Sequence, residues 1–303
     1  TPTWDPSPGD DGDPCSRTAP CSTFAGALSK TAAGGEISVI DPAGYGAVTI
    51  NKSITINGMW GGEAGVLAVG VNGVVINAAP TDVVVLRGLT FEGRGTGFNG
   101  VRVNGAGAVH IKDCIIQNFR SESGGQGNGV NVIPAFGTVE LTITDTLLQN
   151  NGAAASGGGG VRIRPNAGSS VKATLTRGQA LNNTVGVLVD GDASTGAIDV
   201  VIRDSDLSGN AAQGLVSLSP NNSDASVRVT VAGSTVANNG TFGVQSVGQQ
   251  STVRIGGSTV SGNGGPGLQA NNSGILQSYG DNYTQGNGAA NGGCSFHVPS
   301  PNN

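Results

Sequence analysis

Alternating apolar and polar residues recur along most of this chain, in short stretches separated by turns rich in glycine and asparagine. From residue 100 onward, a glycine followed by an apolar residue opens each repeat, and successive openings are 24 to 31 residues apart. The seven openings are Gly100-Val101, Gly129-Val130, Gly160-Val161, Gly186-Val187, Gly214-Leu215, Gly243-Val244 and Gly267-Leu268. Strict alternation predicts β-strands with one buried face. A repeat of this length predicts a solenoid, in which each coil packs only against its neighbours.

The coils can be aligned with one another almost residue by residue. Each opens with a strand such as GVRVN or GVRIR, continues through a second such as VELTITD, and ends with a shorter third strand. Because one face of every strand points inward, we predict a continuous core of Val, Ile and Leu. The closing turns carry Asn151, Asn210, Asn239, Asn263 and Asn287. The inward row of the third strand is predicted to hold Cys114, Thr146, Gln179, Ser205, Ser234 and Ser258, beside an apolar row that includes Leu181.

The same alignment produces two rows of charged residues. The outer face of the second strands carries a row of alternating sign: Glu140, Lys172, Asp199 and Arg228. The ends of these strands carry another: Asp113, Asp145, Arg177 and Asp204. Either row could form a ligand-binding stripe, but opposite charges about 4.8 Å apart on neighbouring strands favour structural ion pairs. Aspartate at a strand-to-turn corner also commonly bonds its own backbone.

The chain before the repeats predicts a cap for the solenoid. Residues 1–21 are rich in Pro, Asp and Gly and predict an extended leader, in which Cys15 and Cys21 form a local disulfide. Residues 22–34 predict a short amphipathic helix that covers the open end of the first coil. We expect one all-β domain of nine or ten three-strand coils over residues 35–294, followed by a tail over 295–303.

Composition narrows the functional classes. The chain has 303 residues, of which 53 are glycine, and only 12% are charged and 4% aromatic. Glycine without a triplet period excludes collagen, and recurrent Val, Ile and Leu argue against disorder. The net charge of −5 and the absence of a basic patch argue against nucleic-acid binding. No run of 18 apolar residues predicts a membrane span. Low charge and a start at Thr1 without Met fit a secreted protein whose signal has been removed.

At this point the chain resembles a known family. The capping helix, the segment AGGEISVIDPAGYGAVTINKSITING and the glycine-headed coils with closing Asn are similar to the right-handed parallel β-helix proteins of the pectate-lyase-like superfamily, specifically its secreted bacterial members without assigned activity. The resemblance covers residues 22 to about 294 and implies a right-handed solenoid. The catalytic segments of polygalacturonase-type hydrolases are missing, because there is no Asp-Asp pair after Asp11, no GHG and only two histidines. No segment similar to the pectate lyase vWiDH motif is present either.

The resemblance also indicates where a ligand would bind, because the groove of the superfamily runs across the first strand of each coil. Outward residues of these strands that could bind a substrate are Arg102, Asn104, Asn131 and Gln245. Arg162 and Arg164 are predicted to lie beside Asp190 of the next coil, as candidate catalytic residues for an acidic sugar. Arginine would bind a uronate carboxylate, and Asp190 would act as a base or, with Asp192, as a calcium ligand. The alternative is an inter-coil salt bridge on a polar face.

These observations lead to one expected function and two alternatives. We expect a secreted protein that interacts with a polysaccharide and has no recognisable catalytic set. The first alternative is a lyase or glycoside hydrolase acting on an acidic polysaccharide, and the second is a structural or adhesive rod at the cell surface. No cofactor is expected other than calcium at the two aspartates. The sequence leaves open whether the Gly-rich loops 120–128 and 151–160 cover the groove, and it specifies no oligomeric state.

Overall fold

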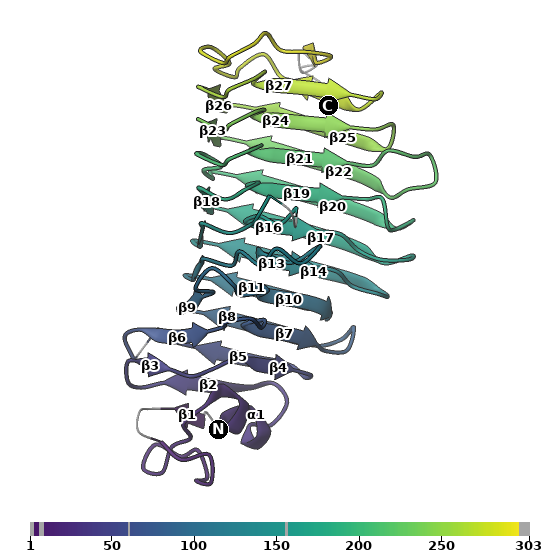
Figure 1. Ribbon diagram of the computed structural model, residues 1–303. Helices are drawn as coiled ribbons and strands as arrows, with labels where there is room; N and C mark the ends of the chain where they lie inside the picture. The colour runs from purple at the N-terminus through teal and green to yellow at the C-terminus, as the bar shows by residue number, and fades with distance from the viewer. Residues whose placement is uncertain (1–2, 6–8, 60, 155–156, 297–303) are drawn as a thin grey trace.

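The computed structural model describes residues 3–5, 9–59, 61–154 and 157–296 and shows an elongated solenoid of parallel strands with one short helix near its N-terminal end (Figure 1). The solenoid has about eight turns, slightly fewer than the nine or ten that the repeat predicted. Some coils are incomplete, both at the ends and at Asp206, which forms only isolated bridges. The first turn lacks a strand where the helix packs, and the last has only an isolated bridge in place of its third strand.

The first strands of the coils form a nine-stranded sheet. Its strands in chain order are β4 (Val48–Ile50), β7 (Val74–Asn77), β10 (Asn99–Gly105), β13 (Asn128–Val132), β16 (Val161–Ile163), β19 (Val187–Asp190), β21 (Leu215–Leu218), β24 (Val244–Val247) and β27 (Leu268–Asn271). Neighbours pair in parallel, so corresponding residues of successive coils form straight rows along the solenoid.

The second strands form a twelve-stranded sheet that runs the length of the molecule. Its strands are β1 (Thr3–Asp5), β2 (Gly35–Val39), β5 (Ile54–Asn57), β8 (Val83–Arg87), β11 (Ala108–Lys112), β14 (Thr138–Thr144), β17 (Ser170–Thr176), β20 (Ala197–Arg203), β22 (Ser226–Ala232), β25 (Ser251–Gly256), β28 (Ile275–Ser278) and β29 (Ser295–Phe296). The predicted tail over 295–303 therefore begins as a strand paired with β28, and residues 297–303 lie outside the described part of the chain.

The third strands are short and form two sheets. The larger contains β3 (Ala43–Gly44), β6 (Ala64–Leu67), β9 (Leu89–Glu92), β12 (Ile115–Gln117), β15 (Leu147–Gln149) and β18 (Gln179–Leu181), and the smaller β23 (Thr235–Ala237) and β26 (Thr259–Ser261). Only the isolated bridges of Asp206 to Gln179 and Thr235 join them.

The predicted core is present, with one error of register. Val, Ile and Leu from all three sheets are buried in a continuous cluster along the solenoid. On β18, however, Ala180 is the inward residue, while Gln179 is exposed and Leu181 half-buried. Gln179 and Leu181 were therefore assigned one position away from their true rows. The cause is Gly178, which follows the corner residue Arg177 in the place where other coils carry Cys114 or Thr146.

Buried asparagines hold the closing turns of successive coils together. Each amide Nδ2 donates to a backbone carbonyl and to the Oδ1 of the next asparagine in the row, as Asn210 does to Ala180 O at 3.1 Å and Asn239 Oδ1 at 2.9 Å. The row is Asn151, Asn183, Asn210, Asn239, Asn263 and Asn287. Sequence alignment identified five of its members and missed Asn183. Since these amides satisfy both one another and the main chain, the row locks the register of the coils.

The outer charged row on the second strands has the predicted register. Glu140, Lys172, Asp199 and Arg228 are successive strand partners. Arg228 makes a close, two-pronged pair with Asp199, with N–O distances of 2.6 and 2.9 Å. This is the only ion pair of the row within 4 Å in the described chain. The row is therefore a partial ladder rather than a continuous one.

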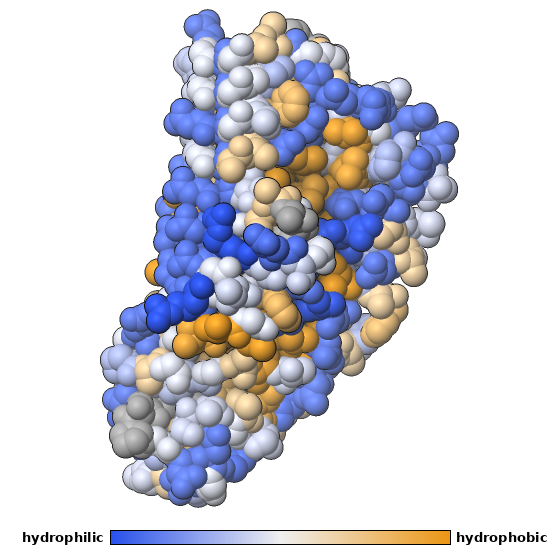
Figure 2. Space-filling model, in the orientation of Figure 1, coloured by the Kyte–Doolittle hydropathy of each residue, from blue (hydrophilic) through white to orange (hydrophobic). Residues whose placement is uncertain are grey.

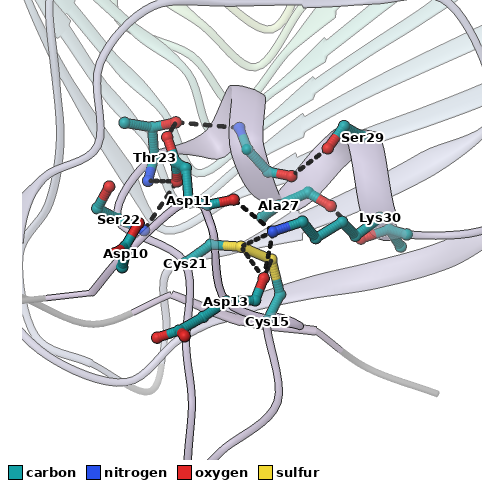
Figure 3. The surroundings of a disulfide bond; sticks show 12 residues. Asp10, Asp11, Asp13, Cys15, Cys21, Ser22, Thr23, Ala27, Ser29 and Lys30 are labelled. Carbon is teal, nitrogen blue, oxygen red and sulfur yellow. Dashed lines mark hydrogen bonds between the residues drawn. A yellow bond between two sulfur atoms is a disulfide. The ribbon is translucent and has the colours of Figure 1, made fainter.

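The N-terminal segment packs on the first coils as a cap. Helix α1 (Phe24–Lys30) begins after Thr23, whose Oγ1 accepts a hydrogen bond from Gly26 N, and it buries Phe24 and Leu28 against the solenoid. It is shorter than the predicted 22–34. The predicted disulfide joins Cys15 to Cys21, and Figure 3 shows Lys30 reaching from the helix to the backbone carbonyls of the leader. Lys30 therefore holds the leader against the helix through two backbone carbonyls, those of Asp11 and Asp13.

Candidate functional site

A row of polar side chains crosses the outer face of the nine-stranded sheet. Arg102 on β10 is the strand partner of Asn131 on β13, and Asn131 is the partner of Arg162 on β16. The next members of the row are apolar, Leu188 on β19 and Val216 on β21. Figure 2 shows hydrophilic residues gathered over the middle turns, with hydrophobic areas on either side along the solenoid. These three polar residues thus form one patch, and the row becomes polar again only at Gln245 and Gln269.

Arg162 and Arg164 meet the carboxylate of Asp190, as predicted from the alignment of the coils. Arg164 Nε lies 3.0 Å from Asp190 Oδ2, and Arg162 Nη2 lies 3.9 Å from the same oxygen. Arg164 also binds Asp192, with its Nη2 2.7 Å from Asp192 Oδ1. Asp190 and Asp192 were predicted to bind calcium. In the structure both carboxylates instead contact the guanidinium of Arg164.

Burial controls the protonation of this group. Asp190 is only 6% exposed, and burial, followed by the neighbouring Asp192 side chain, raises the pKa of Asp190 to about 6. The attraction of Arg164 works in the opposite direction and is outweighed. Burial likewise lowers the pKa of Arg162, which Asp190 partly counteracts. A carboxylate with such a pKa exchanges protons near neutral pH.

The loop between β12 and β13 folds over this row. Three side chains donate to one oxygen of the loop, the carbonyl of Gly125: Asn128 Nδ2 at 3.2 Å, Asn131 Nδ2 at 3.1 Å and Arg162 Nη1 at 3.3 Å. The second Gly-rich loop lies against the first, because Gly159 N donates to Asn128 Oδ1 at 3.1 Å. Loop 120–128 therefore covers part of the face that the sequence predicted as a groove.

A cavity of about 300 Å³ remains between this loop and the sheet. Arg102, Arg162 and Arg164 line it together with Asn131, Asn166 and Gln126. None of its lining residues, all within the described ranges, is acidic, since Asp190 and Asp192 lie behind Arg164 rather than at the wall. Two buried side-chain atoms of the lining have no hydrogen-bond partner, Asn131 Oδ1 and Arg162 Nε. The cavity is therefore positively charged and incompletely hydrogen-bonded.

The other two residues predicted to bind a substrate, Asn104 and Gln245, do not line this cavity. Asn104 accepts a hydrogen bond from Arg102 Nε at 2.9 Å and so orients that side chain. Gln245 lies on β24, three strands from β16, or about 14 Å at the usual strand spacing. Sequence reasoning missed Gln126 and Asn166, which lie in loops outside the repeating strands. Their polarity alone gave no signal, because the chain is rich in such residues.

A larger cavity of about 550 Å³ lies at the corner between the second and third strands. It is lined by Asp113, Asp145 and Arg177 of the second charged row, and Arg177 binds Asp145 through two N–O contacts of 2.7 and 2.9 Å. Asp113, Asp145 and Arg177 all have φ near +50°, as a tight corner requires. Cys114 beneath them is buried, and burial raises its thiol pKa to about 12. These features are those of a structural corner and an inert core cysteine.

The described residues contain no group of three or more His, Cys, Asp and Glu side chains placed to hold a metal ion. In the same part of the chain, no helix has the length and apolar character of a membrane span.

This chain is similar in fold to known proteins. A family model described as a right handed beta helix region matches residues 99–288. The solved structure of pectate lyase Pel9A is similar at 16% sequence identity and a TM-score of 0.54, over 98% of this chain and 77% of that one. The mannuronan C-5 epimerase AlgE4 A-module of Azotobacter vinelandii is similar at 15% identity and a TM-score of 0.46, over 99% and 88%. No curated protein matches the chain in sequence.

Proposed function

This chain belongs to the right-handed β-helix family, and from that premise we propose that it is an extracellular protein that binds an acidic polysaccharide without cleaving it. The proposed binding surface is the outer face of the nine-stranded sheet around Arg102, Asn131, Arg162 and Arg164. The local disulfide between Cys15 and Cys21 supports an extracellular location, since such bonds persist in oxidising compartments.

One observation carries the proposal: a cavity lined by three arginines and no acidic residue, on a protein whose net charge is −5. Arginine matches the planar geometry of a carboxylate with two parallel hydrogen bonds. Arg102 has no acidic partner within 4 Å in the described chain, so its charge is free to meet a ligand. A local positive site on an otherwise acidic surface selects an anionic segment of a partner.

Binding is favoured over catalysis because the candidate catalytic residues are engaged with one another. Asp190 is buried against Arg164, and its second oxygen accepts a hydrogen bond from Asp192 N at 3.2 Å. His110 lies on β11 of the other long sheet, and the second histidine, His297, lies outside the described residues. The cavity therefore offers anion recognition, without a freely exposed base beside it.

A lyase acting on the same ligand is the second candidate, supported by the pKa of Asp190, which burial raises to about 6. A carboxylate with that pKa could take a proton from a sugar ring near neutral pH, while arginine neutralises the uronate. This mechanism requires that Asp190 leave Arg164 when the substrate binds.

The experiment is electrophoresis of the purified protein through gels that contain an acidic or a neutral polysaccharide, with and without calcium. We expect retardation by polygalacturonate or alginate, relieved by salt, and no retardation by a neutral glucan. Arg102→Gln should weaken the apparent affinity about tenfold, as loss of a charged hydrogen bond implies. Lys172→Gln, which removes the same charge from the twelve-stranded sheet, is the matched control and should leave the affinity unchanged.

Product analysis of the same mixtures separates the alternatives. Unsaturated products that absorb in the ultraviolet would identify a lyase, and new reducing ends without such absorbance a hydrolase. If no acidic polysaccharide is bound or cleaved, the proposal is wrong, and a structural rod becomes the better interpretation.

A further inference from the structure

Two neighbouring strands each present one buried polar atom that lacks a partner. Asn131 Oδ1 is an acceptor on β13, and Arg162 Nε is a donor on β16. The two residues are strand partners, and Asn131 is only 1% exposed. An unmatched buried polar atom is destabilising, so a pair of them on neighbouring strands beside a cavity requires an explanation.

Their orientation is determined by their other contacts. The Nδ2 of Asn131 donates to Gly125 O, which directs Oδ1 away from that carbonyl. The guanidinium of Arg162 uses Nη1 for the same carbonyl, and its Nη2 faces Asp190 Oδ2. Only Nε is left. The two unpaired atoms thus need one group that accepts from a guanidinium and donates to an amide oxygen.

A hydroxyl group meets both needs at once. Strand partners are about 4.8 Å apart, and one oxygen with two hydrogen bonds of about 2.8 Å can span that separation. A carboxylate or a sulfate ester accepts hydrogen bonds but has no proton to donate to Asn131.

Building on the proposed function, we propose that this cavity is a subsite for one acidic sugar residue that carries a free ring hydroxyl group as well as its carboxylate. The hydroxyl accepts from Arg162 Nε and donates to Asn131 Oδ1, while the carboxylate binds Arg102 and Arg164. The cavity volume of about 300 Å³ lies at the lower end of small-ligand pockets, which suits one sugar ring rather than several.

Entry to this subsite requires movement of the loop between β12 and β13. Both unpaired atoms are buried with the loop in its present position, and the Gly125 carbonyl lies against the side chains of Asn131 and Arg162. Gly125 has a φ of +73°, in the left-handed region that glycine adopts without strain. The three hydrogen bonds to its single oxygen are 3.1 to 3.3 Å long, at the long end of the usual range, and these are the bonds that opening of the loop would break.

The test is isothermal titration of the full-length protein with tetragalacturonate and tetramannuronate, and with matched tetramers that lack one ring hydroxyl. We expect the wild type to bind an intact tetramer about tenfold more tightly than one of its deoxy forms, in line with the loss of the two buried hydrogen bonds that the hydroxyl makes. Asn131→Leu and Arg162→Lys each remove one of the two hydroxyl contacts, and Lys keeps the charge. Both variants should show a clearly smaller preference for the intact form, because each keeps only one of the two hydroxyl contacts. Thr174→Val, on β17 of the other sheet, is the control and should keep the tenfold preference.

The outcomes separate this subsite from the broader function. If the acidic tetramers bind but the wild type shows no hydroxyl preference, or both variants retain it, the subsite assignment is wrong while polysaccharide binding stands. Because the wild-type measurement needs no mutant, this result is decisive even if a variant fails to fold. If neither tetramer nor the parent polysaccharides bind, the proposed function is wrong, and the subsite is rejected with it.

Discussion

At the scale of single residues, burial and the neighbouring arginines act in opposite directions on the pKa of Asp190. Its two arginine neighbours favour the charged form, yet burial prevails and raises the pKa of Asp190 to about 6. Asp192, at the turn that follows, is an exposed second carboxylate that also faces Arg164. The charge of the cluster therefore depends on pH around 6.

Asp190 should make the stability of the protein depend on pH in a defined direction. Because the pKa of Asp190 is higher in the folded state than the ordinary value of 3.8, the folded protein binds this proton more tightly. The resulting stabilisation is complete below about pH 3.8 and is lost as the pH rises through about 6. Relative to Asp190→Asn, the wild type should lose at most about 3 kcal/mol of unfolding free energy across this range.

The measurement is urea denaturation of both proteins between pH 3.5 and 7.5. The comparison with Asp190→Asn removes the contribution of other carboxylates, whose lowered pKa values act in the opposite direction. A difference in unfolding free energy that stays constant with pH would show that Asp190 titrates normally.

At the scale of elements, the glycine at the head of each coil and the asparagine at its close act together. A Cβ built on Gly160 would lie 2.6 Å from the Gly186 carbonyl oxygen and 3.1 Å from Asn183 Nδ2. The head glycine is thus required because the next coil and the asparagine row pass too close for a side chain. The head glycines and the closing asparagines are therefore linked by the same close packing of neighbouring coils.

Replacing an interior member of the asparagine row should cost more than replacing its end. Asn210 accepts from Asn183 N at 3.0 Å and donates to Ala180 O and Asn239 Oδ1, all buried. Asn210→Ala should lower the unfolding free energy by about 3 kcal/mol, because several buried groups lose their partners together. Asn287→Ala, at the half-buried end of the row, should cost about 1 kcal/mol. Chemical denaturation compares the two, and equal losses would contradict a cooperative row.

At the scale of the whole molecule, the solenoid has two ends that must be covered. The edge of β4 and the apolar interior of the first coil are covered by α1, which is anchored by the leader and its disulfide. At the other end, β29 adds to β28. Open ends of a parallel solenoid present unpaired backbone groups and apolar surface, which promote stacking of one molecule on another.

Removal of residues 1–33 should therefore convert the protein into one that self-associates. The change exposes the edge of β4 and the surface that Phe24 and Leu28 cover. Sedimentation velocity over a range of concentrations should show larger species for the truncated chain than for the full-length chain. A truncated protein that sediments identically at every concentration would show that the helix is not needed as a cap. Association of the full-length chain would instead favour the structural rod.

The sequence by itself determined the architecture, because a solenoid repeats one local solution. Alternation, the glycine heads and the closing asparagines recur in successive coils, so comparison of coils predicted the strand order, the parallel register and the core. The same comparison brought Arg162 and Arg164 to Asp190, since residues at equal places in successive coils must be neighbours. It failed where a coil departs from the pattern, as at Gly178, and at the ends, where the helix replaces a strand.

Only the tertiary structure decided the candidate site. The loop that carries Gly125 lies outside the repeat, so no alignment of coils could place its carbonyl over Asn131 and Arg162. The cavity, the exclusion of acidic side chains from its wall and the two unpaired atoms all depend on that placement. So does the pKa of Asp190, because burial is a property of the packed chain rather than of its neighbours in sequence.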